Sequence, residues 1–223
     1  MKILHLSCSP RGQASESYRL SRKIVDRLLL REPAAMVTDR VIGDGSIAHI
    51  DANYALAQHE AGAEVGKEGT VLESEGLIRE LESADVIVIG TPMHNLSLPS
   101  ALKAWIDHVV RARRTFHVTP AGKVGLLRDR PVLVAVSSGG TFSGERARQP
   151  DFLTPYLRVV LGTIGLKDLN FFTVEGTGHG KDAVMKARAD AEEEVEKHFA
   201  SVPMNAMNVS SGTGRSLRRR EIA

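Results

Sequence analysis

Two short, continuous apolar runs constrain the fold of this chain more than any other feature of its sequence. They are VIVIG at residues 86–90 and VLVAV at residues 132–136. A strand with one face in water alternates apolar and polar residues, whereas a strand that is buried on both faces is apolar throughout. Both runs therefore indicate central strands of a parallel sheet that is covered on both sides.

Strand and helix patterns alternate along the rest of the chain. Apolar runs predict further strands at residues 3–7 and 169–174, and residues 36–42 form a weaker, alternating candidate for an edge strand. Between them, apolar residues recur at three- and four-residue steps and predict helices over residues 17–31, 70–83, 98–113, 154–164 and 181–200. This order predicts an α/β fold: a three-layer, doubly wound, five-stranded parallel sheet of flavodoxin-like type, with strand order 2-1-3-4-5.

One domain is expected over residues 1–200, because a chain of 223 residues is only slightly longer than a typical domain. Residues 43–69 show no clear periodicity and are rich in glycine, so they are predicted to form an excursion from the sheet that is partly helical. Residues 201–223 are rich in Ser, Gly, Asn and Arg, a composition typical of a disordered tail.

Charge, hydropathy and cysteine content exclude several classes of protein. The net charge is only +2 and the basic residues are mostly scattered, which argues against a nucleic-acid partner. No apolar window is long enough to span a membrane, and the apolar start of the chain is too short for a signal peptide. The single cysteine, Cys8, cannot form a disulfide within the chain, which favours a reducing, cytoplasmic location.

The loop after the first predicted strand is rich in serine. In an open α/β sheet, ligands bind beyond the carboxyl ends of the strands, where this loop lies. Ser9, Ser15 and Ser17 come at or just before the start of the first helix, where free N–H groups and the helix dipole attract anions. With Arg11 nearby, the loop is predicted to bind a phosphate monoester. The alternative is that the serines only cap the helix.

Two other turns belong to the same edge of the predicted sheet. Residues 91–96, TPMHNL, can lie along a flat heterocycle, because Met93 and Leu96 offer apolar contact and Asn95 both donates and accepts hydrogen bonds. In the SSGG turn at residues 137–140, two glycines allow the backbone to approach a ligand closely. The alternative is that both are plain strand-to-helix turns.

Motifs for other chemistries do not occur in the sequence. The P-loop, the dinucleotide-binding glycine fingerprint, the G-x-S-x-G elbow of hydrolases and the H-E-x-x-H zinc motif are all missing. One cysteine and dispersed histidines indicate no metal site. The glycine-rich stretch GTGHG at residues 176–180 is predicted to be a flexible loop. Ser97 is predicted to cap the helix over residues 98–113.

These residues together make the chain resemble the FMN-dependent NADH-azoreductases, also described as NADH:quinone oxidoreductases, over about residues 1–200. The resemblance rests on Ser9 with the run Ser15–Ser17, on PMHNLSLPSALKAWID from Pro92, on TFHVTPAGKVGLL, on SSGG and on LTPYLRVVLGTIGL. The stretch from Pro92 is fairly specific for this family, whereas the serine pattern alone is not.

The resemblance implies which residues contact FMN. The phosphate would be held by residues at the start of the first helix, Ser9, Ser15, Glu16 and Ser17. One edge of the isoalloxazine ring would be contacted by four consecutive residues, Met93, His94, Asn95 and Leu96. The other edge would be flanked by the SSGG turn, Ser137, Ser138, Gly139 and Gly140. The resemblance also implies a homodimer with active sites near the subunit interface.

The implied activity is the reduction of quinones and azo compounds by NADH or NADPH in a two-electron, ping-pong hydride transfer. The flavin would carry the chemistry, so no single catalytic side chain is expected. A contact to the 2′-phosphate of NADPH cannot be identified, although three arginines are candidates, Arg111, Arg113 and Arg114.

Some positions depart from the family pattern. His94 stands where members usually have Tyr, and Leu96 and Val118 stand where an aromatic residue is common. These departures leave the preferred electron acceptor open. Three alternative functions also stay open: a flavodoxin-type one-electron carrier, a general NAD(P)H:FMN reductase, and a binding module that keeps the fold without a cofactor.

Overall fold

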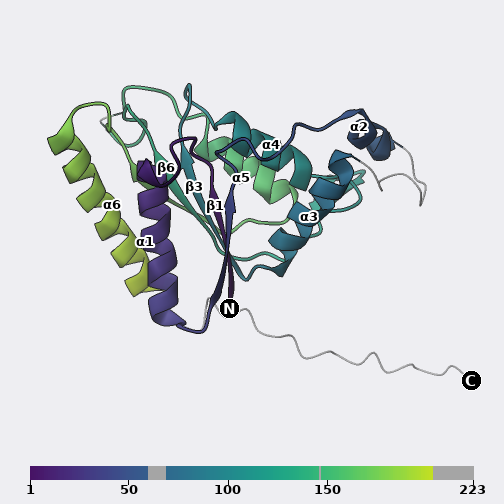
Figure 1. The fold of residues 1–223 in the computed structure, drawn as a ribbon, viewed down its shortest axis with the longest axis horizontal. Coiled ribbons are helices and arrows are strands. Elements are labelled where there is room, and N and C mark those ends of the chain that lie inside the picture. The colour runs from purple at the N-terminus through teal and green to yellow at the C-terminus, as the bar shows by residue number, and fades with distance from the viewer. Residues whose placement is uncertain (60–68, 146, 203–223) are drawn as a thin grey trace, which may run out of the picture.

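A parallel sheet of five strands forms the centre of the computed structural model, which describes residues 1–59, 69–145 and 147–202 (Figure 1). The strands are β1 (Lys2–Ser7), β2 (Met36–Val41), β3 (Val86–Pro92), β6 (Val132–Ser137) and β7 (Leu169–Val174). They lie in the order β2-β1-β3-β6-β7, and every neighbouring pair is parallel. Counted as five strands, this is the predicted 2-1-3-4-5 order of a flavodoxin-like fold.

Burial along the strands follows the apolar pattern of the sequence. Every residue of β6 is buried, and so are six of the seven residues of β3. β2 has no fully buried residue, in agreement with its place at the edge of the sheet. The continuous apolar runs therefore mark the two strands that are covered on both faces.

Helices cover both faces of the sheet in the predicted three layers. On one side lie α1 (Glu16–Arg31) and α6 (Lys181–Ser201), and on the other lie α3 (Thr70–Ser83), α4 (Ser100–Val109) and α5 (Thr154–Thr163) (Figure 1). Each side has its own apolar core, with Leu28 and Val195 buried in one and Trp105 in the other. None of the described helices has the length and apolar character needed to cross a bilayer.

A row of ion pairs joins α1 to α6. Arg188 binds Glu16 with both nitrogens of its guanidinium edge, at 2.6 and 2.7 Å. Further along the same two helices, Lys23 pairs with Glu192 and Arg27 with Glu196. α6 ends at Ser201, and the predicted tail beyond residue 202 lies outside the described residues. The division of the chain at residue 200 stays a prediction.

The excursion after β2 docks on α4. Part of it is helical, as predicted: α2 spans Ala52–His59, while residues 60–68 lie outside the described ranges. The buried Tyr54 donates its hydroxyl proton to Asp107 O at 2.7 Å. His108 Nε2 lies 2.9 Å from Ala48 O. These contacts place the excursion against α4, away from the α1 and α6 side of the sheet.

The region around α4 differs from the prediction in two ways. The helix begins at Ser100 rather than 98 and ends at Val109 rather than 113, where the hydroxyl of Thr115 donates to the Val109 carbonyl. Ser97 does not cap the helix, because the N-cap position belongs to Pro99 and the Ser97 hydroxyl donates instead to Phe152 O. A short antiparallel hairpin of β4 (Phe116–Thr119) and β5 (Gly122–Gly125) then follows, which the sequence did not predict.

Candidate cofactor site

The three predicted ligand turns meet at one edge of the sheet. They follow β1, β3 and β6, which are neighbours and run parallel, so their carboxyl ends lie side by side. Backbone bonds tie the turns together: Cys8 N donates to Gly90 O at 2.9 Å, and Met93 N donates to Ser137 O at 2.7 Å. Residues that are far apart in the sequence therefore form one continuous rim.

The start of α1 is built around buried serine hydroxyls. Ser15 is the N-cap of the helix, since its Oγ accepts from Tyr18 N at 3.2 Å and donates to Gly12 O at 2.8 Å. The capping interpretation is thus correct for Ser15. Ser17 Oγ lies 3.4 Å from Ser15 Oγ, and the nearby Ser9 Oγ accepts from the N–H of Arg11. The first N–H groups of an α-helix have no acceptor within the helix, so this cluster adds backbone donors to the hydroxyls.

The donor set fits a phosphate group. Hydroxyls and helix N–H groups bind an anion without bringing negative charge, and the helix dipole favours it. The one carboxylate in the first turn of α1, that of Glu16, is held by Arg188, whose hydrogen bonds keep the pKa of Glu16 below its ordinary value. The Glu16 side chain is thus directed to α6, and its contribution to a phosphate site is limited to its backbone N–H.

Two glycines that the sequence analysis did not single out hold this loop in place. A Cβ on Gly43, just after β2, would lie 2.2 Å from Ser9 O and 2.7 Å from Ser9 N. A Cβ on Gly90 would lie 2.5 Å from Ser21 Oγ and 2.9 Å from Ser17 O. Real Cβ contacts are longer, so the chain after β2 approaches the serine loop closely, and β3 approaches the first turns of α1 closely, only because these residues are glycines.

The turn after β3 is a tight hairpin turn under backbone strain. His94 and Ser97 exchange both of their backbone hydrogen bonds, at 2.8 and 3.0 Å. Asn95 and Leu96 between them have φ values of 47° and 69°, the pattern of a type I′ turn. Asn tolerates this conformation, but a branched residue such as Leu is strained in it by about 1–2 kcal/mol. Strain of this kind concentrates at ligand sites, which agrees with the prediction for residues 91–96.

The SSGG turn after β6 is supported by the glycine-rich stretch at residues 176–180. Thr177 N donates to Ser138 O, Gly178 N to Gly139 O and Gly176 N to Gly140 O, at 3.0 to 3.1 Å. The stretch is a loop, as predicted, and three of its amides hold the SSGG turn. A Cβ on Gly139 would meet nothing within 4 Å, so this position faces open space at the rim.

The loop beyond SSGG is fixed by Glu175, a residue without any sequence signal of its own. Its carboxylate accepts from Phe142 N at 2.7 Å, from Ser143 N at 3.1 Å and from Ser143 Oγ at 2.6 Å. These partners lie more than thirty residues away in the sequence, so no local pattern reveals the contact.

A cavity of about 580 Å³ lies between this loop and the first half of α6. Its volume is within the usual range for small-ligand pockets. Three carboxylates, those of Glu145, Glu175 and Asp190, line it against one lysine, Lys186. This charge is unfavourable for a phosphate, which leaves the start of α1 as the better anion site.

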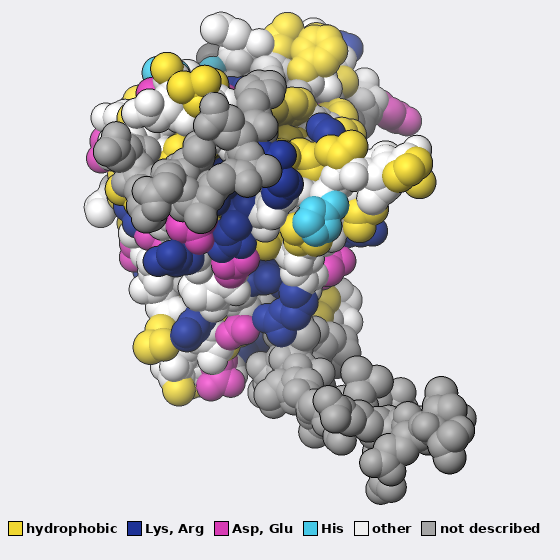
Figure 2. Space-filling view, turned by 90° about the vertical axis from the view of Figure 1, so that its right-hand side faces the viewer, with side chains coloured by type: hydrophobic (Ala, Val, Ile, Leu, Met, Phe, Trp, Pro, Cys, Tyr) yellow, Lys and Arg dark blue, Asp and Glu magenta, His cyan; other side chains and the backbone are white. Residues whose placement is uncertain are grey.

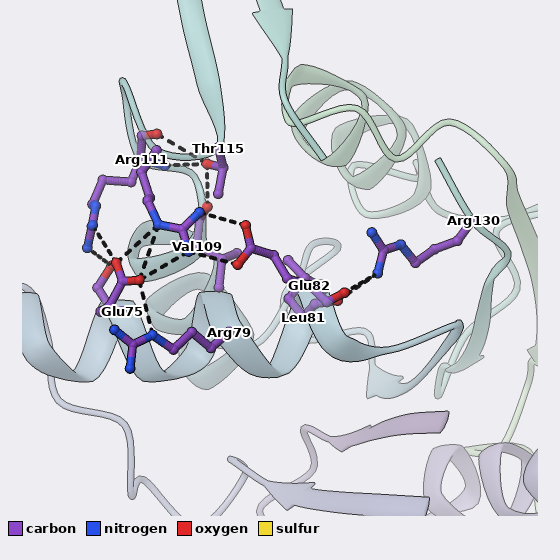
Figure 3. A network of polar contacts seen from close by, with 10 residues as sticks. Glu75, Arg79, Leu81, Glu82, Val109, Arg111, Thr115 and Arg130 are labelled. Atoms are coloured by element: carbon purple, nitrogen blue, oxygen red, sulfur yellow. Dashed lines mark hydrogen bonds and ion pairs between the residues drawn. The ribbon is translucent and has the colours of Figure 1, made fainter. Parts of the chain in front are cut away.

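The arginines proposed for an NADPH phosphate are largely committed to other partners. Arg111 binds Glu75 at 2.8 Å, and Arg114 binds both Glu75 and Glu82 (Figure 3). Figure 2 shows the end of the molecule that carries α2 and α3, where Lys and Arg side chains lie beside Asp and Glu. Arg111 and Arg114 thus form a network between α3 and the α4–β4 connection rather than a phosphate site.

The chain is similar to known proteins over most of its length. The family model for the flavodoxin-like fold matches residues 1–199. FMN-dependent NADH:quinone oxidoreductase 4 of Pseudomonas fluorescens strain Pf-5 is 49% identical over 183 residues, which cover 82% of this chain and 87% of the relative. FMN-dependent NADH:quinone oxidoreductase 2 of Cupriavidus pinatubonensis strain JMP 134 is 45% identical, with 83% of this chain and 91% of the relative covered.

A solved structure supports the fold. The FMN-dependent NADH-azoreductase from Bacillus anthracis strain Ames Ancestor, determined in complex with FMN, superimposes with a TM-score of 0.72 at 23% identity, over 89% of this chain and 99% of the other. The chain therefore belongs to the flavodoxin-like fold family and, within it, to the FMN-dependent NADH:quinone oxidoreductases.

Proposed function

We propose that this chain is an FMN-dependent oxidoreductase that uses NADH or NADPH to reduce quinones and azo compounds. The names of its relatives support this activity. The observation that carries the proposal is the rim itself: a serine-rich helix start, free of unpaired carboxylates, lies next to two turns of close backbone approach. The helix start suits the phosphate of FMN, and the two turns suit its flat ring.

In this proposal each turn has one task. Ser9, Ser17 and the first N–H groups of α1 hold the phosphate, while Ser15 shapes the helix start through its cap. Met93, His94, Asn95 and Leu96 line one edge of the ring, and Ser137, Ser138, Gly139 and Gly140 line the other. Bound FMN supplies hydride-transfer chemistry that no side chain of the chain provides.

The protein contributes orientation and a fixed polar environment. The strained 91–96 turn holds its backbone N–H groups in a fixed orientation toward the ring. These groups therefore need no reorganisation during the reaction. NADH and the acceptor occupy the same space in succession, which explains why no separate nicotinamide-binding motif is present. Ping-pong kinetics follow from this arrangement.

Two exposed positions are expected to set the acceptor range. His94 is exposed at the hairpin turn, and Val118 is 73% exposed on β4. Family members commonly carry Tyr at the first position and an aromatic residue at the second, and histidine and valine offer less surface for stacking on a planar acceptor. We therefore expect this chain to prefer acceptors whose binding does not depend on stacking. Replacing His94 by Tyr should lower the KM for a planar quinone, and an unchanged KM would contradict this role.

Initial-rate kinetics test the function. The purified chain should bind FMN, NADH should bleach the flavin absorption in the absence of air, and double-reciprocal plots with a quinone should be parallel. Intersecting plots would rule out the ping-pong mechanism. Reduction only by single-electron donors would favour the carrier, and a protein that takes up no FMN would favour a binding module without a cofactor.

We also propose a homodimer in the cytoplasm. The family resemblance implies the dimer, and three large apolar side chains, those of Val118, Phe152 and Val159, expose between 60% and 73% of their surface and are available to an interface. Light scattering of the purified protein should give twice the mass of 24.2 kDa. A monomer at micromolar concentration would contradict the dimer. The supply of NADH and the single, buried Cys8 support the location.

A further inference from the structure

Gln149 links the two turns that line the predicted ring site. Its Nε2 lies 3.1 Å from Met93 Sδ and 3.1 Å from Ser138 Oγ. The amide therefore donates one proton to each turn. Ser138 Oγ lies 3.9 Å from the same sulfur and closes the triangle. Met93 and Ser138 are buried, whereas Gln149 is only partly so.

The segment that carries Gln149 is folded back onto the rim. Arg148 N and Gln149 N both donate to Thr141 O, at 2.8 and 3.1 Å. A few residues further, Phe152 N donates to Leu96 O at 3.1 Å. One segment therefore holds the 91–96 turn at its base, through Gln149 and Met93, and at its tip, through Phe152 and Leu96.

Gly140 leaves room for the Gln149 amide. A Cβ on Gly140 would lie 2.3 Å from Gln149 Oε1 and 2.9 Å from Cδ, and its three nearest atoms all belong to the Gln149 side chain. The φ of Gly140 is outside the left-handed region, so backbone strain does not require glycine here. A side chain at this position would instead displace the amide at the end of the Gln149 side chain.

From these contacts we propose that Gln149 is a positioning residue, which fixes the spacing of the two turns between which the proposed function places the isoalloxazine ring. The inference rests on that proposed function. Without the amide, Met93 and Ser138 lose the donor that they share, and the turns are held together by fewer bonds. FMN should then bind less tightly, and the acceptor should be oriented less well.

The first test uses the full chain with two variants of Gln149 and one control. Gln149→Met keeps the length of the side chain but removes both donors. Gln149→Glu keeps its shape but replaces the donors by a carboxylate. Arg148→Met is the matched control, because the Arg148 side chain is exposed in the same segment.

Fluorescence titration gives the FMN dissociation constant of each variant. Gln149→Met should raise it roughly three- to tenfold, which corresponds to the loss of one ordinary hydrogen bond to a hydroxyl and a weaker one to the thioether sulfur of Met93. Arg148→Met should leave it unchanged. Gln149→Glu should also shift the midpoint potential of bound FMN to a more negative value, because a carboxylate beside the ring disfavours a reduced, more negative flavin.

A double-mutant cycle tests the pairing with Gly140. Gly140→Ala should displace the amide and raise the FMN dissociation constant to a similar extent as Gln149→Ala. The double variant should be no worse than either single one, since both remove the same contact. Additive losses would show that Gly140 and Gln149 act separately, and would contradict the inference.

The outcomes separate this inference from the proposed function. If the wild-type chain binds FMN and the Gln149 variants keep its dissociation constant and midpoint potential, Gln149 has no positioning role and the proposed function stands. If the variants lose FMN affinity only in proportion to a lower unfolding temperature, with an unchanged potential, the role is structural and the inference is wrong. If the wild-type chain binds no FMN, both proposals fall.

Discussion

Gly43 shows how one missing side chain shapes the phosphate loop. A methyl group there would lie 2.2 Å from Ser9 O, so Gly43→Ala must push the loop away from β2. We expect the variant to lose about 1–3 kcal/mol of unfolding free energy and most of its FMN affinity. Urea denaturation and fluorescence titration measure the two effects.

Gly76→Ala is the matched control for that variant. Gly76 lies in α3 with nothing within 4 Å of a new Cβ, so alanine there should stabilise the helix by up to about 1 kcal/mol. FMN affinity should not change in the control. Equal FMN affinities in the two variants would show that Gly43 does not support the phosphate loop.

The sequence did not predict the contacts that individual side chains make between the turns of the site. Ser9, Met93 and Ser137 follow predicted strands, so their place at the rim was predictable from topology alone. Gln149 contacts Met93 across 56 residues, and it follows neither a strand nor a recognised motif. Contacts of this kind depend on side-chain geometry, which single-sequence patterns do not encode.

At the scale of elements, the start of α1 carries the sharpest prediction. Ser15→Asp together with Ser17→Asp would place two negative charges where the phosphate is proposed to bind. The double variant should retain no FMN after gel filtration. The fold should persist, because aspartate caps a helix as well as serine does at position 15, and the helix dipole favours a carboxylate in the first turn at position 17. Circular dichroism checks the fold, and the absorption spectrum checks the flavin.

The control for that variant adds the same charge elsewhere. Ser83→Asp with Ser201→Asp places both carboxylates at the ends of α3 and α6, on the opposite rim of the sheet. This control should keep its FMN. Retention of FMN by the Ser15 and Ser17 variant as well would move the phosphate site away from α1.

Elements with a regular apolar pattern, whether continuous, alternating or helical, were predictable, and those without one were not. β3 and β6 are buried almost throughout, so their sequences contain little else than apolar residues. The β4–β5 hairpin exposes most of its residues, so its two strands of four residues show no hydrophobic period. The early end of α4 depends on the Thr115 hydroxyl, a contact outside the helix.

At the scale of the whole molecule, stability in acid should depend on Glu75. Hydrogen bonds from Arg114 and Arg111 hold its pKa below the ordinary value. A lowered pKa in the folded state stabilises the protein above the unfolded pKa of about 4.3, and this contribution is lost as the pH falls through the folded pKa. Glu75→Gln should lower the unfolding free energy by about 1 kcal/mol at pH 7, since the network is partly exposed.

Urea denaturation between pH 7 and pH 3 measures this effect. The difference between wild type and Glu75→Gln should be constant above about pH 5 and should shrink below about pH 4. Glu193→Gln, which removes an exposed partner of Lys197, is the control and should follow the wild type. A difference that does not vary with pH would show that Glu75 acts by packing rather than by its charge.

The row of ion pairs between α1 and α6 favours one alignment of the two helices. Sliding α6 by one turn in one direction would bring Glu192 opposite Glu16, and sliding it in the other would bring Arg188 opposite Lys23. Either displacement sets like charges against each other, so electrostatic repulsion resists it. The signs of the three paired residues of α1, Glu16, Lys23 and Arg27, thus help to fix the position of α6 along α1.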